Sequence, residues 1–157
     1  MISNLKQSVN DIDKLGADAE NTYAFRQIDG GAHHVVKEDG VVYIETSSDA
    51  FSIHEITHIR QSLNNGGLQF STNNQLKNIC NVIEGIDSYI KCANAEVEAY
   101  QMQYSYDPSS YIGRTHSLQG IDINSVGNIM NEYGYPVYPH IYNGLDYYNT
   151  YNMLKCR

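Results

Sequence analysis

The residues of this chain best suited to metal chemistry are two histidines four positions apart, in the run His54-Glu55-Ile56-Thr57-His58. On a helix, residues four apart lie on the same face, so His54 and His58 can bind one cation through their imidazole nitrogens. Glu55 lies about 100° further round the helix, where its carboxylate cannot easily ligate the ion but can reach a water bound to it. Two histidines and a carboxylate base can turn zinc-bound water into a nucleophile at neutral pH. The run therefore predicts one Zn²⁺ ion and hydrolysis, with Glu55 as the general base.

Zinc needs a third protein ligand if its fourth position is to stay open for water. One known motif, His-Glu-x-x-His-x-x-Gly-x-x-His, supplies a third histidine as the ligand. This chain has Gln61 at the glycine position and Asn64 at the position of that histidine, so the motif is excluded. A glutamate from a helix predicted over 87–106 is the alternative. There Glu96 lies about 70° and Glu98 about 130° from the centre of the apolar stripe. We expect Glu96 to complete the site, with Glu98 as the fallback. The stripe comprises Ile90, Ala93, Val97, Tyr100 and Tyr104.

Capping and turn residues indicate the elements that carry these side chains. Ser47-Ser48-Asp49 are good N-caps and Asn64-Asn65-Gly66-Gly67 a good C-cap, so a helix is predicted between them. Strand-like residues on both sides of Asp39-Gly40 predict a hairpin over 32–46. Further helices are predicted over 2–13, 74–84 and 87–106, near 125–133 and at the C-terminus. Seven of the 14 tyrosines follow Gly127, and we expect a loop-rich C-terminal part with tyrosine as its main core residue.

Composition excludes several classes of partner. A formal net charge of −8 with scattered basic residues argues against binding to nucleic acid or anionic lipid. No apolar run approaches 18 residues and no signal peptide is apparent, so we expect no membrane span. The protein is expected in the cytoplasm, or exported by a signal-independent route or as part of a larger secreted protein. The three cysteines form no Cys-x-x-Cys pair, and a Cys80–Cys92 disulfide stays open.

The two motifs together resemble the gluzincin branch of zinc metallopeptidases, in which a Glu-x-x-Ala setting follows His-Glu-x-x-His. Glu96 and Ala99 match that setting. The runs 54–61 and 96–101 also look like the small metallopeptidase domains of bacterial polymorphic (Rhs-type) toxins. The resemblance covers roughly residues 35 to 106. It implies a protein or peptide substrate, and a toxin or effector domain with a cognate immunity or carrier protein.

The fold expected from this resemblance is α+β and zincin-like, with 1–157 as a single metallopeptidase domain. Its N-terminal part, 1–67, would hold a small hairpin or sheet packed on the helix of His54 and His58. The remainder, 68–157, would hold the second ligand-bearing helix and the tyrosine-rich part. A peptide substrate could then add as a strand to the edge of the segment Val41–Glu45.

The resemblance also implies an oxyanion stabiliser, a side chain that donates to the developing negative charge on the scissile carbonyl. The sequence offers four candidates in the C-terminal region: His116, His140, Tyr111 and Tyr138. A ligating histidine normally donates a hydrogen bond from its second ring nitrogen. The sequence offers three candidates to accept that bond: Asp87, Asp122 and Asn94. We interpret His33 and His34 as surface or hairpin residues, because neighbours on a strand point to opposite faces.

Two other hypotheses stay open. The chain could be a catalytically inactive zincin-fold binding module with structural zinc, although such a site has no use for Glu55 as a base. It could also be an interaction domain that carries no metal. Metal content and the behaviour of Glu55→Gln distinguish these hypotheses from the peptidase.

Overall fold

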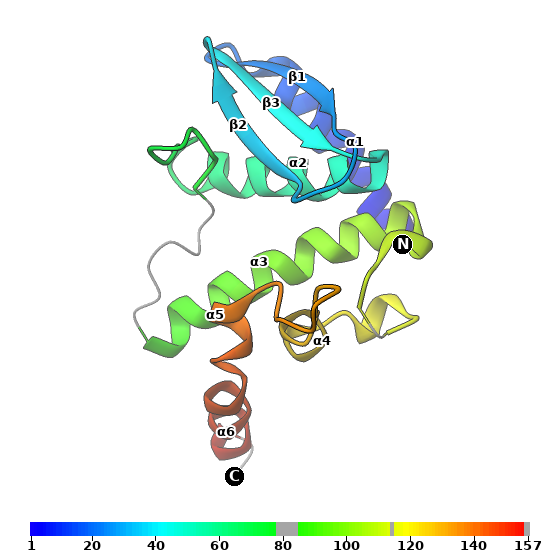
Figure 1. Ribbon diagram of the computed structural model, residues 1–157, viewed down its shortest axis with the longest axis vertical. Coiled ribbons are helices and arrows are strands. Elements are labelled where there is room, and N and C mark those ends of the chain that lie inside the picture. The colour runs from blue at the N-terminus through cyan, green and yellow to red at the C-terminus, as the bar shows by residue number, and fades with distance from the viewer. Residues whose placement is uncertain (78–84, 114, 156–157) are drawn as a thin grey trace.

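The chain forms a mixed α+β structure, which confirms the expected class. The computed structural model describes residues 1–77, 85–113 and 115–155, and in these it has six α-helices and one three-stranded sheet. Figure 1 shows the sheet, α2, α3 and the C-terminal helices as successive layers, with α2 between the sheet and α3. The elements in chain order are α1 (Ile2–Ala17), β1 (Thr22–Gln27), β2 (His34–Glu38), β3 (Val41–Thr46), α2 (Asp49–Asn64), α3 (Gly85–Tyr106), two 3₁₀ turns (Pro108–Ser110 and Leu118–Gly120), α4 (Ile123–Gly127), α5 (Pro139–Tyr142) and α6 (Leu145–Lys155).

The sheet is built on the predicted hairpin. Asp39 and Gly40 both adopt positive φ, as a tight two-residue hairpin turn requires, and they join β2 to β3 in antiparallel register. A strand that the sequence did not predict, β1, pairs in parallel with the other side of β3. The sheet order is therefore β1-β3-β2. The expectation of an open edge at Val41–Glu45 is wrong, because β3 is the central strand and both its edges are paired.

Helix α2 begins and ends where its caps predict. The Ser48 side chain accepts a hydrogen bond from the backbone N–H of Phe51, which satisfies one of the donors exposed at a helix start. One face of the helix packs against the sheet through Ile56 and Ile59, which join a core cluster with Val42 and Ile44 of β3. This packing places α2 under the sheet, and it leaves the opposite side of the helix facing α3.

Helix α3 is buried on more than one face. The predicted apolar stripe packs into a second core cluster, which it shares with the C-terminal part of the chain. Other residues of α3 are buried outside that cluster: Ala95, Glu96, Ala99, Met102, Gln103 and Ser105. Asp107 and Pro108 follow its last residue and start a short 3₁₀ turn, so the helix ends where predicted. Because two layers cover α3, a carboxylate can be buried on it away from the apolar stripe.

The C-terminal part differs from its prediction in detail. Its core is mainly aliphatic, whereas several late tyrosines, among them Tyr133, Tyr135 and Tyr147, are exposed. Tyrosine is therefore not the main core residue of this part, although Tyr89, Tyr100 and Tyr111 belong to the same core cluster. The aliphatic members are Ile121, Ile123, Val126, Ile129, Ile141 and Leu145. The short helix predicted near 125–133 is α4, which is earlier and shorter, and the C-terminal helix is α6.

Two predictions concern residues at the margin of the description. The helix predicted over 74–84 is wrong for its first residues, since Gln75 and Leu76 form β-bridges, and 78–84 lie outside the described residues. Cys92 is buried in the core, but Cys80 lies outside the described residues, so the Cys80–Cys92 disulfide stays a prediction. Among the helices described, none is long and apolar enough to cross a membrane.

Candidate metal centre

The centre lies between α2 and α3, where three buried side chains meet. His54 and His58 project from α2 and Glu96 projects from α3. The Nε2 atoms of the two histidines are 3.1 Å apart. Glu96 Oε2 lies 3.4 Å from His58 Nε2 and 3.7 Å from His54 Nε2. Each of the three residues thus offers one ligand atom to a common point.

The three separations fit a metal centre, and the 3.1 Å between the two Nε2 atoms also fits a hydrogen bond. In a tetrahedral site with metal–ligand bonds of about 2.0–2.1 Å, neighbouring ligand atoms are about 3.3 Å apart. The three observed separations lie within a few tenths of an ångström of that value. The two contacts of Glu96 are also longer than an ordinary hydrogen bond to a carboxylate. An ion between the three atoms would contact all of them at once.

Two buried atoms at this centre are without a hydrogen-bond partner in the described part of the chain: Glu96 Oε2 and His54 Nδ1. A buried carboxylate oxygen without a hydrogen bond is costly, because it has lost its water. Glu96 is 2% exposed, so solvent cannot supply the missing contact. A cation would supply the missing contact to Glu96 Oε2. The residues present therefore fit a metal ion. The set of two imidazoles and one carboxylate can hold such an ion, and it does not by itself identify the metal.

Charges at the centre are strongly coupled. Burial lowers the pKa of His58, but the nearby carboxylates of Glu96 and Glu55 outweigh this effect and raise it to about 9. Burial raises the pKa of Glu96, but the two imidazoles outweigh it and hold that pKa well below its usual range. The negative charge of Glu96 is thus stabilised by whichever cation lies beside it, a proton on His58 or a metal ion.

Two cavities open onto the centre, and Glu55 lines both. The smaller has a volume of about 190 Å³ and also borders the three ligand residues. The larger, of about 440 Å³, is mostly apolar and extends past Phe51 and Ile112. Among the described residues, none hydrogen-bonds or forms an ion pair with the Glu55 carboxylate. It is therefore a carboxylate that lies beside the three converging residues without a hydrogen-bond or ion-pair partner in the described part of the chain.

The four candidates for an oxyanion stabiliser lie in different places. Tyr138 lines both cavities, and its hydroxyl donates a hydrogen bond to the Tyr100 hydroxyl at 3.0 Å. Tyr111 is buried behind Tyr100 and donates to Ser125. His116 and His140 are exposed, and neither borders the two cavities. Of the four, only Tyr138 is placed to contact a molecule bound at the centre.

Glu98, the fallback ligand, lies outside the group. Its side chain is 45% exposed, and its carboxylate contacts Arg60 and Gln61 of α2. The candidates Asp87 and Asn94 are exposed, and Asp122 caps α4, so none of these three contacts a ligand histidine. Gln61 does contact a ligand histidine, because its Oε1 lies 2.9 Å from His58 Nδ1. The expectation of a partner among Asp87, Asp122 and Asn94 is therefore wrong.

Two residues near the centre were not predicted there: Tyr100 was expected only in the apolar stripe, and His33 only as a surface or hairpin residue. The Tyr100 ring meets the His54 ring edge-on, with centroids 4.5 Å apart. Its position four residues after Glu96 places both on one side of α3, and that spacing was the available signal. His33 lines both cavities, stacks on Phe51 and shares a hydrogen bond with Ser47. No local pattern indicates this placement, because it depends on how the sheet packs over α2.

Comparisons with protein-family models, curated proteins and solved structures gave no match to this chain. The centre must therefore be interpreted from its own geometry and chemistry.

Proposed function

We propose that this chain is a zinc-dependent peptidase with a zincin-like α+β fold. His54, His58 and Glu96 would hold the zinc ion, and Glu55 would act as general base. The observation that carries the proposal is the Glu55 carboxylate, unpaired among the described residues, in a cavity bordered by three converging side chains that could hold a metal ion. A bound zinc ion would supply Lewis acidity and lower the pKa of a water ligand to about 7.

The donor set supports zinc over harder cations. Two imidazole nitrogens and one carboxylate oxygen are ligands that zinc prefers, whereas magnesium and calcium prefer oxygen alone. Three protein ligands leave one tetrahedral position open, as in catalytic zinc sites, whereas structural sites have four. The two cavities beside the ligands provide the room that an open position needs.

Proton transfer is the task that we assign to Glu55. Its carboxylate would accept the proton of the attacking water and pass it to the nitrogen of the leaving amine. The Tyr138 hydroxyl would donate a hydrogen bond to the oxygen of the scissile carbonyl as negative charge develops there. In the structure this hydroxyl donates to Tyr100, so a bound substrate would compete for the same proton.

A peptide suits the surroundings of the centre. The smaller cavity is bordered by His33, His34 and Val35 at the start of β2, an edge strand of the sheet. From the carbonyl of Val35 onward this edge is already paired, since Val35 C=O accepts from Leu76 and Lys37 N–H donates to Asn74. An extended peptide at the start of β2 would therefore cross the centre. The toxin or effector role and the immunity or carrier partner implied by the resemblance stay predictions.

The second candidate function is a binding module in which zinc is structural. The burial of all three ligand residues favours it, because structural sites are closed to solvent. The two functions differ in what they require of Glu55, which a structural site does not use.

The substitution Glu55→Gln tests the peptidase directly. It keeps the size of the side chain and removes its basicity, so we expect cleavage of a denatured protein mixture to fall at least ~100-fold. Zinc content should stay at one ion per chain, because Glu55 is not among the converging ligands. Glu132→Gln, which changes an exposed turn residue, is the control and should leave the rate unchanged. Equal activity of Glu55→Gln and wild type would reject the peptidase and leave the structural-zinc module.

A further inference from the structure

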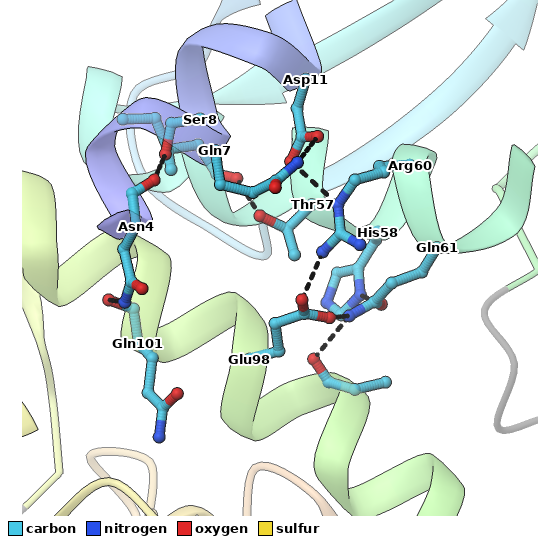
Figure 2. Close-up of polar contacts among 12 residues, drawn as sticks. Asn4, Gln7, Ser8, Asp11, Thr57, His58, Arg60, Gln61, Glu98 and Gln101 are labelled. Atoms are coloured by element: carbon cyan, nitrogen blue, oxygen red, sulfur yellow. Dashed lines mark hydrogen bonds and ion pairs between the residues drawn. The ribbon is translucent and has the colours of Figure 1, made fainter. Parts of the chain in front are cut away.

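Gln61 joins the ligand His58 to polar side chains from three helices, and Figure 2 shows how they lie. Its Oε1 is 2.9 Å from His58 Nδ1. Its Nε2 is 3.0 Å from the carbonyl oxygen of Ala95 and 2.9 Å from Glu98 Oε2. One amide thus contacts the ligand histidine on its own helix and two oxygen atoms on α3.

The two oxygen atoms determine which way the amide faces. A carbonyl oxygen and a carboxylate oxygen accept hydrogen bonds, so the NH₂ group of Gln61 must point toward Ala95 and Glu98. The amide oxygen must then point toward His58. Because that oxygen is only an acceptor, His58 Nδ1 must carry a proton and donate. The second ring nitrogen, Nε2, is then the one left to bind a metal ion.

Glu98 is itself held in place by a chain of charges. Arg60 Nη2 lies 2.7 Å from Glu98 Oε1, as an ion pair without the alignment of a hydrogen bond. Arg60 Nε donates to Asp11 Oδ2 at 2.9 Å. Asp11 is fully buried on α1 and also accepts a hydrogen bond from Gln7 at 2.7 Å. The network of Asp11, Arg60, Glu98 and Gln61 therefore runs from α1 to the metal centre.

We propose that Gln61 is a positioning residue of the metal centre, which holds His58 as the tautomer that presents Nε2 to the ion. Asp11, Arg60 and Glu98 hold Gln61 in the orientation that this requires. The inference rests on the proposed metal site. It also gives Glu98 a role: it does not ligate the ion, but it orients the residue that orients a ligand.

The test measures the affinity of the purified chain for Zn²⁺ by competition with a chelating dye. Gln61→Met keeps the length of the side chain and removes both ends of the amide. Loss of such a partner of a ligand typically weakens metal binding 10- to 100-fold, and we expect a loss in that range. The matched control is Gln101→Met on α3, which also removes a glutamine-to-carbonyl hydrogen bond, to Ile121 at 2.9 Å. It contacts no ligand and should leave the affinity within about threefold of wild type.

A spectroscopic measurement separates positioning from general loss of structure. In the zinc-loaded wild type, the Nδ1 proton of His58 should give an NMR resonance that is protected from solvent exchange. We expect this resonance to disappear in Gln61→Met and to persist in Gln101→Met. If it persists in Gln61→Met with unchanged affinity for zinc, Gln61 has no positioning role.

Glu98→Ala tests the next member of the network after Gln61, on a side chain that is 45% exposed. We expect it to weaken Zn²⁺ binding roughly 3- to 10-fold in the wild type and to have no further effect in Gln61→Met, because both act through one amide. Equal effects in the two backgrounds would overturn the network.

If wild type binds no Zn²⁺ at all, the proposed function fails. If wild type binds Zn²⁺ and Gln61→Met binds it equally well, only the network fails.

Discussion

Glu96 and Glu98 are two positions apart on α3, and this small separation gives them different environments. Two positions correspond to about 200° of rotation round a helix, so the side chains point to different sides. Glu96 is 2% exposed and faces the two histidines, whereas the Glu98 side chain is 45% exposed and pairs with Arg60. The first has lost its water and lies beside the imidazoles of His54 and His58. The second keeps solvent and a permanent positive charge.

Tyr138→Phe tests the assignment of the oxyanion donor. It removes the hydroxyl and leaves the ring, so we expect kcat on a peptide substrate to fall about 100-fold with little change in KM. The reason is that the hydrogen bond is made mainly to the charge that develops in the transition state. Steady-state kinetics on one purified peptide measures both constants.

Tyr111→Phe is the control for this experiment. Tyr111 is buried behind Tyr100, and its hydroxyl contacts Ser125 rather than the cavities. Its removal should lower the free energy of unfolding by about 1 kcal/mol and leave kcat unchanged. A normal kcat for Tyr138→Phe would contradict the assignment, and the donor would have to be sought elsewhere.

At the scale of single residues, the sequence predicts what depends on helical spacing. His54 and His58 meet because four residues complete about one turn, and Glu96 was favoured over Glu98 by its angle from the apolar stripe. The stripe itself faces the C-terminal core, while Glu96 faces α2. Gln61 and His33 were not predicted at the centre, and Tyr138 was not separated from three other candidates, because their placement depends on contacts between elements that no local pattern encodes.

At the scale of elements, the junction of α1 and β1 is held by Asp18. Its carboxylate accepts hydrogen bonds from the Tyr23 hydroxyl at 2.6 Å and from the Asn21 amide at 3.0 Å. These bonds, that of Tyr23 above all, lower the pKa of Asp18. The folded state therefore favours the ionised carboxylate more than the unfolded state does.

This difference predicts a pH-dependent contribution to stability. A carboxyl group with a lowered pKa in the folded state stabilises it above the unfolded pKa of about 3.9 and loses that effect as pH falls through the folded value. Asp18→Asn should thus lower the free energy of unfolding by about 1 kcal/mol at pH 7 and by progressively less below about pH 4. Urea unfolding of the wild type and of Asp18→Asn across this pH range measures the change in the free energy of unfolding.

Asp13→Asn is the control, since Asp13 is an exposed residue of the same helix and makes no hydrogen bond or ion pair within the described part of the chain. Asp13→Asn should change the free energy of unfolding little at pH 3 or at pH 7. A destabilisation by Asp18→Asn that is the same at pH 3 and pH 7 would show that the charge of Asp18 contributes nothing.

Elements with strong local signals were predicted well. Helix α2 has caps at both ends, α3 ends at a proline, and the hairpin turns at Asp39-Gly40. Strand β1 was not predicted, because Phe25 is exposed and the strand pairs in parallel with β3. A hairpin turn signal cannot predict a parallel pairing. Gln75 forms its β-bridge with Val36 of β2 and Leu76 forms one with Phe70, so local helical spacing gave the wrong answer there.

At the scale of the whole molecule, a bound ion would join the two halves of the chain. Its ligands come from α2, which belongs to the core under the sheet, and from α3, which belongs to the C-terminal core. Zinc that binds only the folded state, at about 1,000 times its Kd, would stabilise the chain by about 4 kcal/mol. For a chain of this length we expect Tm to rise by about 10 °C.

Thermal unfolding with zinc and with excess chelator measures this effect. Glu96→Gln, which keeps the shape of the ligand but removes its charge, should unfold at nearly the same temperature in both conditions. A wild-type Tm that does not depend on zinc would contradict a site shared between the two halves.

Anomalous X-ray diffraction at the zinc edge, on crystals of the zinc-loaded chain, tests the central claim most directly. We expect one peak per chain, about 2 Å from Nε2 of His54, Nε2 of His58 and a carboxylate oxygen of Glu96. Glu98 should lie outside the coordination sphere, still paired with Arg60 and Gln61. A peak that is absent, or one bound by Glu98 in place of Glu96, would contradict this metal centre.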